Sequence, residues 1–106
     1  MNPFGISQKS YAVILNVLMQ YKAIERVIIY GSRAKGNFKE GSDIDLAIVG
    51  EDLSPAVAMD IAAILNERKP LPYKIDVIHY ESITNKSLKE HIDRVGREFQ
   101  IQLENL

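Results

Sequence analysis

The stretch YGSRAKGNFKEGSDIDLAIV, residues 30–49, places a long polar loop between two apolar runs. The run over residues 26–30, RVIIY, is rich in β-branched side chains and predicts a buried strand that Gly31 ends. The run over residues 43–50, DIDLAIVG, predicts a second strand. About a dozen residues join the two strands, fewer than a parallel crossover usually needs, so we expect an antiparallel pair. Residues 32–36, SRAKG, fit one helical turn within the loop.

Apolar residues at helical spacing predict a helix before this strand pair and another after it. The first covers residues 8–22, with Ser7 as its N-cap. The second covers residues 53–69, with Ser54 as its N-cap and Pro55 at its first position. The side chains expected to face the core are Tyr11, Ile14, Leu15, Leu18 and Met19 of the first helix and Val57, Ile61, Ile64 and Leu65 of the second.

The rest of the chain predicts one more strand and one more helix. Pro70 and Pro72 end the second helix, and residues 73–80, YKIDVIHY, predict a third strand. The last helix begins near residues 84–87 and ends at Gly96. Its expected core side chains are Leu88, Ile92 and Val95.

This order of elements indicates an α/β (α+β) fold. A helix between the second and third strands allows a parallel pair there, so we expect a mixed sheet of three strands or slightly more, covered by helices. Residues 1–106 would form a single domain, which their number also favours. The sequence leaves residues 97–106 open between an extended tail and further helix.

The composition excludes several classes of function. There is no cysteine, which excludes disulfides and cysteine-ligated zinc and fits a reducing cytoplasm. We find no signal peptide and no apolar run near the roughly 20 residues of a membrane span, so we expect a cytoplasmic protein without a membrane partner. The net charge of −1 offers no general attraction to nucleic acid, so an anion site must come from a local arrangement.

Three aspartates on the predicted strands form the candidate catalytic site. Asp43 and Asp45 are two residues apart on one strand, so both side chains point to the same face. Asp76 lies inside an apolar strand, where aspartate is disfavoured. If the two strands are neighbours, the carboxylates form a cluster suited to Mg²⁺, with two ions about 3.5–4 Å apart. Alternatively, Asp43 closes the loop while the other two aspartates face water at strand edges.

The loop before the second predicted strand carries groups that suit phosphate. Gly31 lets backbone N–H groups approach an anion, and Ser32 adds a hydroxyl donor. Arg33, Lys35 and Lys39 make the loop basic and are further candidates for contacts with a triphosphate. Such a run of charges is also typical of a loop that only faces water.

The spacing of these motifs makes the set specific: Gly-Ser, ten residues, Asp-x-Asp, and a third aspartate on the next strand. In the segments GSRAKG, SDIDLAIV and KIDVI, and in the order of its elements, the chain resembles the nucleotidyltransferases of the DNA polymerase β superfamily. More narrowly it resembles the minimal nucleotidyltransferase (MNT) proteins. Many of these act as antitoxins of HEPN-domain ribonuclease toxins.

The resemblance implies a role for each motif residue. Gly31 and Ser32 would hold the β- and γ-phosphates of ATP. Asp43 and Asp45 would bind two Mg²⁺ ions. Asp76 would ligate the ion that activates the acceptor hydroxyl and could take its proton. The reaction implied is in-line attack on the α-phosphate, with pyrophosphate leaving.

The acceptor is expected to come from outside this small domain. Nearly all residues are used by the predicted strands and helices, so the acceptor would be brought by a partner protein or lie across an interface between copies of the chain. The resemblance suggests a tyrosine of a HEPN toxin, modified with AMP. Two alternatives stay open: an antitoxin that binds nucleotide without catalysis, and a transferase acting on a small-molecule hydroxyl.

Overall fold

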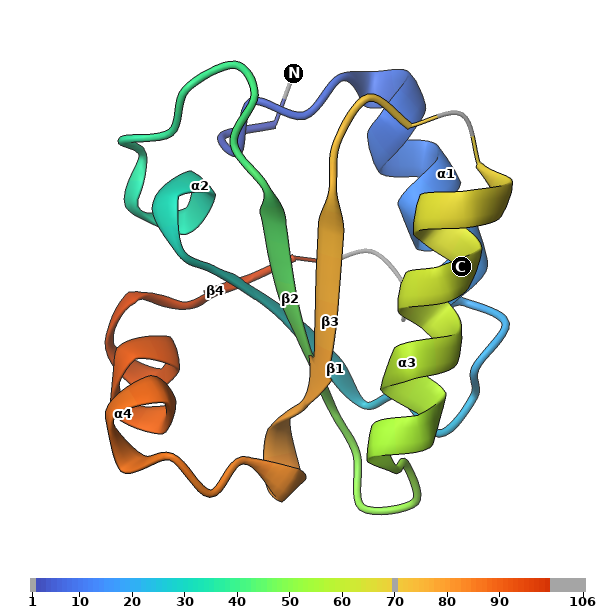
Figure 1. Ribbon diagram of the computed structural model, residues 1–106, viewed down its shortest axis with the longest axis vertical. Coiled ribbons are helices and arrows are strands. Elements are labelled where there is room, and N and C mark those ends of the chain that lie inside the picture. The colour runs from blue at the N-terminus through green and yellow to red at the C-terminus, as the bar shows by residue number, and fades with distance from the viewer. Residues whose placement is uncertain (1, 70, 100–106) are drawn as a thin grey trace.

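The computed structural model describes residues 2–69 and 71–99 as a four-stranded mixed sheet with helices on both faces (Figure 1). Strand β1 pairs antiparallel with β2 and with β4, and β2 pairs parallel with β3. The strand order is β3-β2-β1-β4. These findings confirm the predicted fold class, the mixed sheet and the pairing of its first three strands. The strands are β1 (Arg26–Tyr30), β2 (Ile44–Val49), β3 (Ile75–His79) and β4 (Arg97–Glu98).

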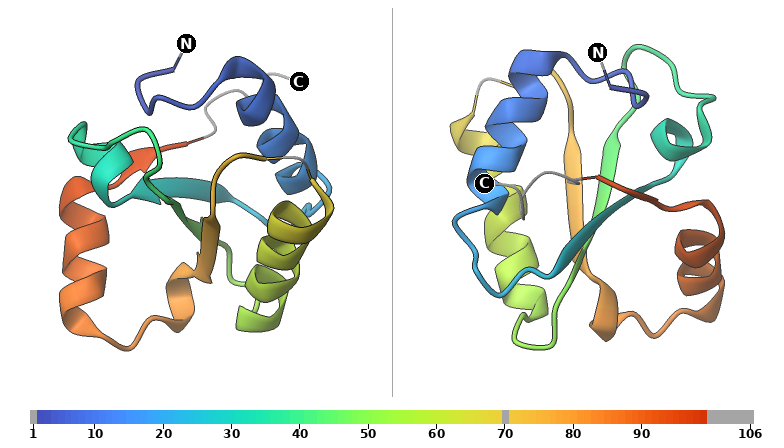
Figure 2. Two further views of the ribbon diagram at one scale, coloured as in Figure 1. Left: turned by 45° about the horizontal axis from the view of Figure 1, so that its top comes forward. Right: turned by 180° about the vertical axis from the view of Figure 1, so that it is seen from behind.

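The helices form a layer on each side of the sheet (Figures 1 and 2). Helices α1 (Gln8–Leu18) and α3 (Pro55–Ala63) cover one face, and α4 (Lys86–Val95) covers the other. The single turn α2 (Ser32–Lys35) follows β1, as predicted for this loop. No helix within the described residues has the length and apolar character needed to cross a membrane.

Side-chain caps fix the start of each longer helix. The Ser7 hydroxyl accepts from the Ser10 N–H at 3.1 Å, and the Ser54 hydroxyl accepts from the Val57 N–H at 3.3 Å. Both caps were predicted from the sequence. Asn85 caps α4 in the same way. Because each cap satisfies an N–H that has no partner within its helix, each one selects the residue at which the helix begins.

The larger apolar core lies between the sheet and the pair α1 and α3. Alternate residues of β1, β2 and β3 point into it, as expected for strands with a buried face. Its fully buried members include Ile14, Leu18, Ile29, Ile44, Leu46, Ile48, Ile61, Leu65 and Ile75. A smaller cluster on the other face packs under α4 and contains Ile28, Tyr30, Ala47 and Ile92.

The end of α1 differs from the prediction. The helix ends at Leu18 rather than residue 22, because the N–H groups of Gln20 and Tyr21 donate three residues back and tighten the last turn. Met19 is consequently 43% exposed instead of facing the core, and Val17 is buried in its place. Met19 was therefore assigned to the wrong face.

Two further segments refine the prediction. After α3 the chain continues as a π-helix, Ile64–Arg68, and Pro70, predicted to end this helix, lies outside the described residues. The tail contributes β4, a strand too short to leave a pattern in the sequence. Phe99 follows it and packs against Phe4 and Tyr11, and the other residues of that segment, 100–106, lie outside the described part of the chain.

Candidate active site

One row across β1, β2 and β3 brings two of the three candidate aspartates together. Tyr30 of β1 pairs with Asp45 of β2, and Asp45 pairs with Asp76 of β3. Residues paired in neighbouring strands have side chains on the same face, so the three side chains lie next to one another. The two carboxyl groups are close enough that a hydrogen bond between them affects the pKa of Asp45. The row therefore places an acidic pair at one end of the sheet, on the face that α4 covers.

Gly31 turns the chain directly against this acidic pair. Its φ of 75° lies in the region that favours glycine, and it leads from β1 into α2. A Cβ atom at this position would lie 2.5 Å from Oδ2 of Asp45. Only glycine therefore allows the backbone to pass this close to the carboxylate, and the turn brings Ser32 to the same end of the sheet.

Burial and neighbouring charge make Asp45 hard to ionise. Its pKa is raised to about 6, first by burial, then by the negative charges of Asp76 and Asp43 and by the hydrogen bond with Asp76. The positive charge of Lys74 acts in the opposite direction. A carboxyl group in this situation is stabilised as an anion when a cation is bound beside it.

The third aspartate lies at the rim of the site. Asp43 is exposed and comes one residue before β2, at the point where the Ile44 N–H donates to the Lys74 carbonyl at 2.9 Å. Within residues 2–69 and 71–99, no three acidic or histidine side chains converge as a ready-made metal site. Carboxylate oxygens are nevertheless the side-chain ligands that suit Mg²⁺, which usually binds one or two of them together with phosphate oxygens.

Two residues of the site were not among the sequence predictions. Tyr30, whose position in the sequence indicates a packing aromatic, lies next to Asp45 in the row. Burial and then the charges of Asp45 and Asp76 raise its pKa to about 12, so its hydroxyl stays protonated and can donate. Lys74 is exposed and close enough to Asp45 to affect its pKa. The signal for Lys74 was its position two residues before Asp76, which puts both side chains on one face of a strand.

Arg33 does not lie where the basic-loop prediction put it. Its side chain is 1% exposed, and its guanidinium donates to the carbonyls of Ser42, Phe4, Gly5 and Glu40 at 2.9–3.4 Å. The rings of Phe38 and Tyr73 flank it at about 5 Å from their centroids. Because its donors are used internally, Arg33 does not fit the expected contact with a triphosphate. It instead anchors the loop that leads to Asp43.

The other basic residues of the loop stay available to a ligand. Lys35 and Lys39 are both exposed, at the end of α2 and in the following loop. The Lys39 N–H donates to the Ser42 hydroxyl at 2.8 Å, and the Ser42 N–H donates back to the Lys39 carbonyl at 3.0 Å. This reciprocal pair closes the turn just before Asp43, so that the loop enters β2 in a defined conformation.

Comparison with known proteins identifies what the chain is similar to. The family model "Polymerase beta, Nucleotidyltransferase" matches residues 13–102. The "Probable protein adenylyltransferase MntA" of Haemophilus influenzae is 30% identical over 90 residues, which cover 85% of this chain and 78% of that protein.

Solved structures of toxin–antitoxin complexes share the fold. A chain in "Crystal structure of the toxin-antitoxin with AMP-PNP" superposes with a TM-score of 0.70 at 21% identity, covering 85% of this chain and 72% of that one. A chain in the complex of tri-AMPylated Shewanella oneidensis HEPN toxin with MNT antitoxin gives a TM-score of 0.66 at 19% identity, covering 92% and 76%. At these identities the structures bear on the fold alone.

Proposed function

Because the chain belongs to the polymerase beta nucleotidyltransferase family, we propose that it transfers AMP from ATP to a hydroxyl group of a HEPN-type toxin and acts as the antitoxin of that partner. The observation that carries the proposal is the adjacent pair Asp45 and Asp76, with the Gly31 turn against it. An acidic pair beside a close backbone turn suits a metal-bound triphosphate better than it suits the interior of a structural domain.

In the proposed mechanism Asp43, Asp45 and Asp76 hold Mg²⁺. Bound there, the metal would stabilise negative charge on phosphate oxygens and favour ionisation of the acceptor hydroxyl. The Gly31–Ser32 backbone and the Ser32 hydroxyl are proposed to hold the phosphates farthest from the acceptor.

The transfer itself exchanges one bond to phosphorus for another. The acceptor oxygen forms a bond to the α-phosphorus while the bond from that phosphorus to its bridging oxygen breaks, and pyrophosphate leaves with the electron pair. The acceptor proton passes to the carboxylate of Asp76, which lies on the edge strand and is open to an incoming partner. The exposed Lys35 and Lys39 are proposed to neutralise the leaving pyrophosphate.

The proposed acceptor is a protein because the described residues are taken up by the sheet and its covering helices. The MntA relative is named a protein adenylyltransferase, and one structural relative is in a complex with an AMPylated HEPN toxin, which supports the same class of acceptor here. The cytoplasm is the proposed compartment, which a chain without cysteine fits.

One observation favours a second function, an antitoxin that neutralises its toxin by binding alone. Asp43 lies exposed one residue before β2, whereas Asp45 and Asp76 pair within the sheet, so a metal bound by all three carboxylates would draw Asp43 toward that pair. An antitoxin that acts by covering its partner would need no such rearrangement.

Intact mass of the co-expressed HEPN-type toxin distinguishes the two functions. With the wild-type chain the toxin is expected to gain one or more AMP masses, and with Asp43→Asn/Asp45→Asn it is expected to gain none. The matched control is Asp52→Asn/Asp60→Asn, which removes the same charge from exposed positions outside the site and should leave the modification intact. A toxin that both the wild type and the site variant bind and silence without modification would establish the binding antitoxin.

A further inference from the structure

The outer edge of β3 is open within the described part of the chain. β3 pairs with β2, and no other described strand lies beside it. The Lys74 carbonyl accepts from Ile44 of β2, and backbone groups alternate in direction along a strand. Asp76 and Ile78 therefore direct their backbone groups toward β2, as Lys74 does, while Ile75, Val77 and His79 direct theirs outward.

Asn66 already occupies the first position of this outer edge. Its amide group donates to the Ile75 carbonyl at 2.7 Å, and its side-chain oxygen accepts from the Ile75 N–H at 2.9 Å. These two bonds are the ones that a neighbouring strand would make. The next N–H and C=O groups that point outward, those of Val77, make no hydrogen bond within the described residues. Edge groups of this kind are a ready template for pairing with another chain.

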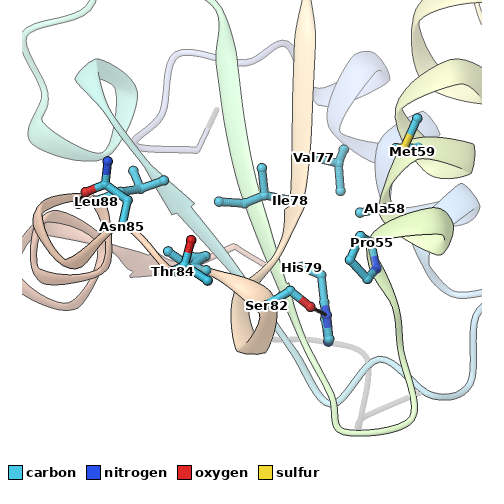
Figure 3. A pocket seen from close by; sticks show the side chains of 11 residues that line it. Pro55, Ala58, Met59, Val77, Ile78, His79, Ser82, Thr84, Asn85 and Leu88 are labelled. Atoms are coloured by element: carbon cyan, nitrogen blue, oxygen red, sulfur yellow. Dashed lines mark hydrogen bonds between the residues drawn. The ribbon is translucent and has the colours of Figure 1, made fainter.

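A groove follows this edge between α3 and the segment that leads into α4 (Figure 3). One part of it, about 380 Å³, has Pro55, Ala58 and Met59 on the α3 side and Ile83 and Leu88 on the other. The neighbouring part, about 530 Å³, reaches Asp76. The two parts share Met59, Val77 and Ile78, so the groove leads along β3 directly to the acidic pair.

The chemistry of the groove changes along its length. The end that Figure 3 shows is mainly apolar, and the 70% exposed Met59 extends the apolar surface of the groove on its α3 side. The other end carries two acidic side chains, Glu67 and Asp76, and no basic one. The groove therefore suits a segment with apolar side chains at one end and a cationic side chain at the other.

Building on the proposed function, we propose that the acceptor protein docks in this groove as an extended segment that adds a strand to the outer edge of β3. Its main chain pairs with the N–H and C=O of Val77, its apolar side chains cover Met59 and Ile78, and a basic residue lies beside Glu67. The modified hydroxyl is then held next to Asp76, so strand addition positions the acceptor for proton transfer.

Amide hydrogen exchange tests the pairing without requiring catalysis. The probe is the co-expressed HEPN-type toxin, bound to the Asp43→Asn/Asp45→Asn chain so that no modification occurs. Exchange of the Val77 amide is expected to slow by about tenfold or more in the complex. The reference is the amide of the exposed Asp52, which donates to no group within the described residues and should not change. An unprotected Val77 in a formed complex would overturn the proposal. Protection that appears in the chain alone as its concentration rises would overturn it too, because a second copy would be the occupant.

Two exposed methionines provide a matched pair for the groove itself. Met59→Glu, in the groove, is expected to weaken binding of the toxin about tenfold or more, because it adds an acidic charge where an apolar side chain docks. Met19→Glu makes the same change at the end of α1, the other exposed large apolar position within residues 2–69 and 71–99, and should bind normally. Both variants should keep Mg²⁺-dependent binding of ATP. Equal affinity of the two variants for the toxin would count against the groove.

The proposed function can fail separately from this inference. A toxin that protects Val77 and depends on Met59, yet gains no AMP with the wild-type chain, would support strand addition and rule out transfer. A toxin that gains AMP while Val77 stays exposed would support transfer and rule out docking at this edge.

Discussion

The two faces of the sheet are built from the same strands, β1, β2 and β3, but carry different chemistry. The residues that face α1 and α3 are buried and apolar, except for the buried His79 at the end of β3. On the face that α4 covers, one end carries Tyr30, Asp45 and Asp76 in a single row, and the other end is apolar around Ala47.

This difference separates the source of stability from the source of function. Burial of apolar side chains under α1 and α3 is the main favourable contribution to folding. The acidic row opposes folding, since it holds negative charges together at a partly buried place. Changes on the first face should therefore alter stability, and changes on the second should alter nucleotide chemistry.

The largest expected loss of stability comes from the α1 and α3 face. Ile14 is fully buried, so Ile14→Ala should reduce the free energy of unfolding by about 3–4 kcal/mol, measured by urea denaturation. AMP transfer per folded molecule should stay unchanged. Met19→Ala, one turn further along the same chain and exposed, is the control and should cost less than about 0.5 kcal/mol.

Arg33 contributes to both stability and function, because it is buried and also anchors the loop that leads to Asp43. Arg33→Lys keeps the charge but cannot reach all four carbonyls, so we expect a loss of about 2–3 kcal/mol in the free energy of unfolding. Weaker binding of ATP with Mg²⁺ should accompany it, since the loop before Asp43 loses its anchor. Lys35→Arg is the control at an exposed position. Unchanged unfolding of the Arg33 variant would show that the buried bonds contribute little.

Gly31 tests how closely the site depends on the backbone. Gly31→Ala should cost about 1–2 kcal/mol of stability, because φ is positive there. It should also abolish most AMP transfer, because the new methyl group would press on the Asp45 carboxylate. Gly36→Ala is a matched control: φ is also positive, at 87°, but nothing lies within 4 Å of a Cβ atom. Full activity in Gly31→Ala would contradict the assigned position of the site.

The sequence predicted the elements of this fold well because their signals are local. Caps at Ser7 and Ser54, alternation along the strands and the spacing of the aspartates all act within a few residues. The pairing of Asp45 with Asp76 followed from the expectation that the two strands are parallel neighbours. These features could be read without knowing the tertiary structure.

The missed features depend on contacts between distant parts of the chain. Arg33 looked the same in sequence as Lys35 and Lys39, and its burial depends in part on the carbonyls of Phe4 and Gly5. Those partners lie 28 or 29 positions away along the chain, beyond the reach of any local pattern. The sequence left residues 97–106 open between an extended tail and further helix for a similar reason, because β1, the partner that makes β4 a strand, lies far away in sequence.

The smallest expected effect is a gain in the free energy of unfolding rather than a loss. It tests the negative charge on the face of the sheet that α4 covers. The pKa of Asp45 is about 6 in the folded chain and near 3.8 in the unfolded one, so between these values the folded state binds more protons. Stability therefore falls as the pH rises from about 4 to 6, and it stays lower above that range.

Asp45→Asn removes this penalty and should stabilise the metal-free chain in EDTA. We expect a gain of about 1 kcal/mol at pH 7.5, after allowing for solvent screening at a partly exposed group, and no gain near pH 4. Thermal unfolding at both pH values measures it, with Asp52→Asn as the control. Added Mg²⁺ should stabilise the wild type more than the variant. A destabilised Asp45→Asn at pH 7.5 would mean that the carboxylate contributes to folding, and the separation of the two faces would not hold.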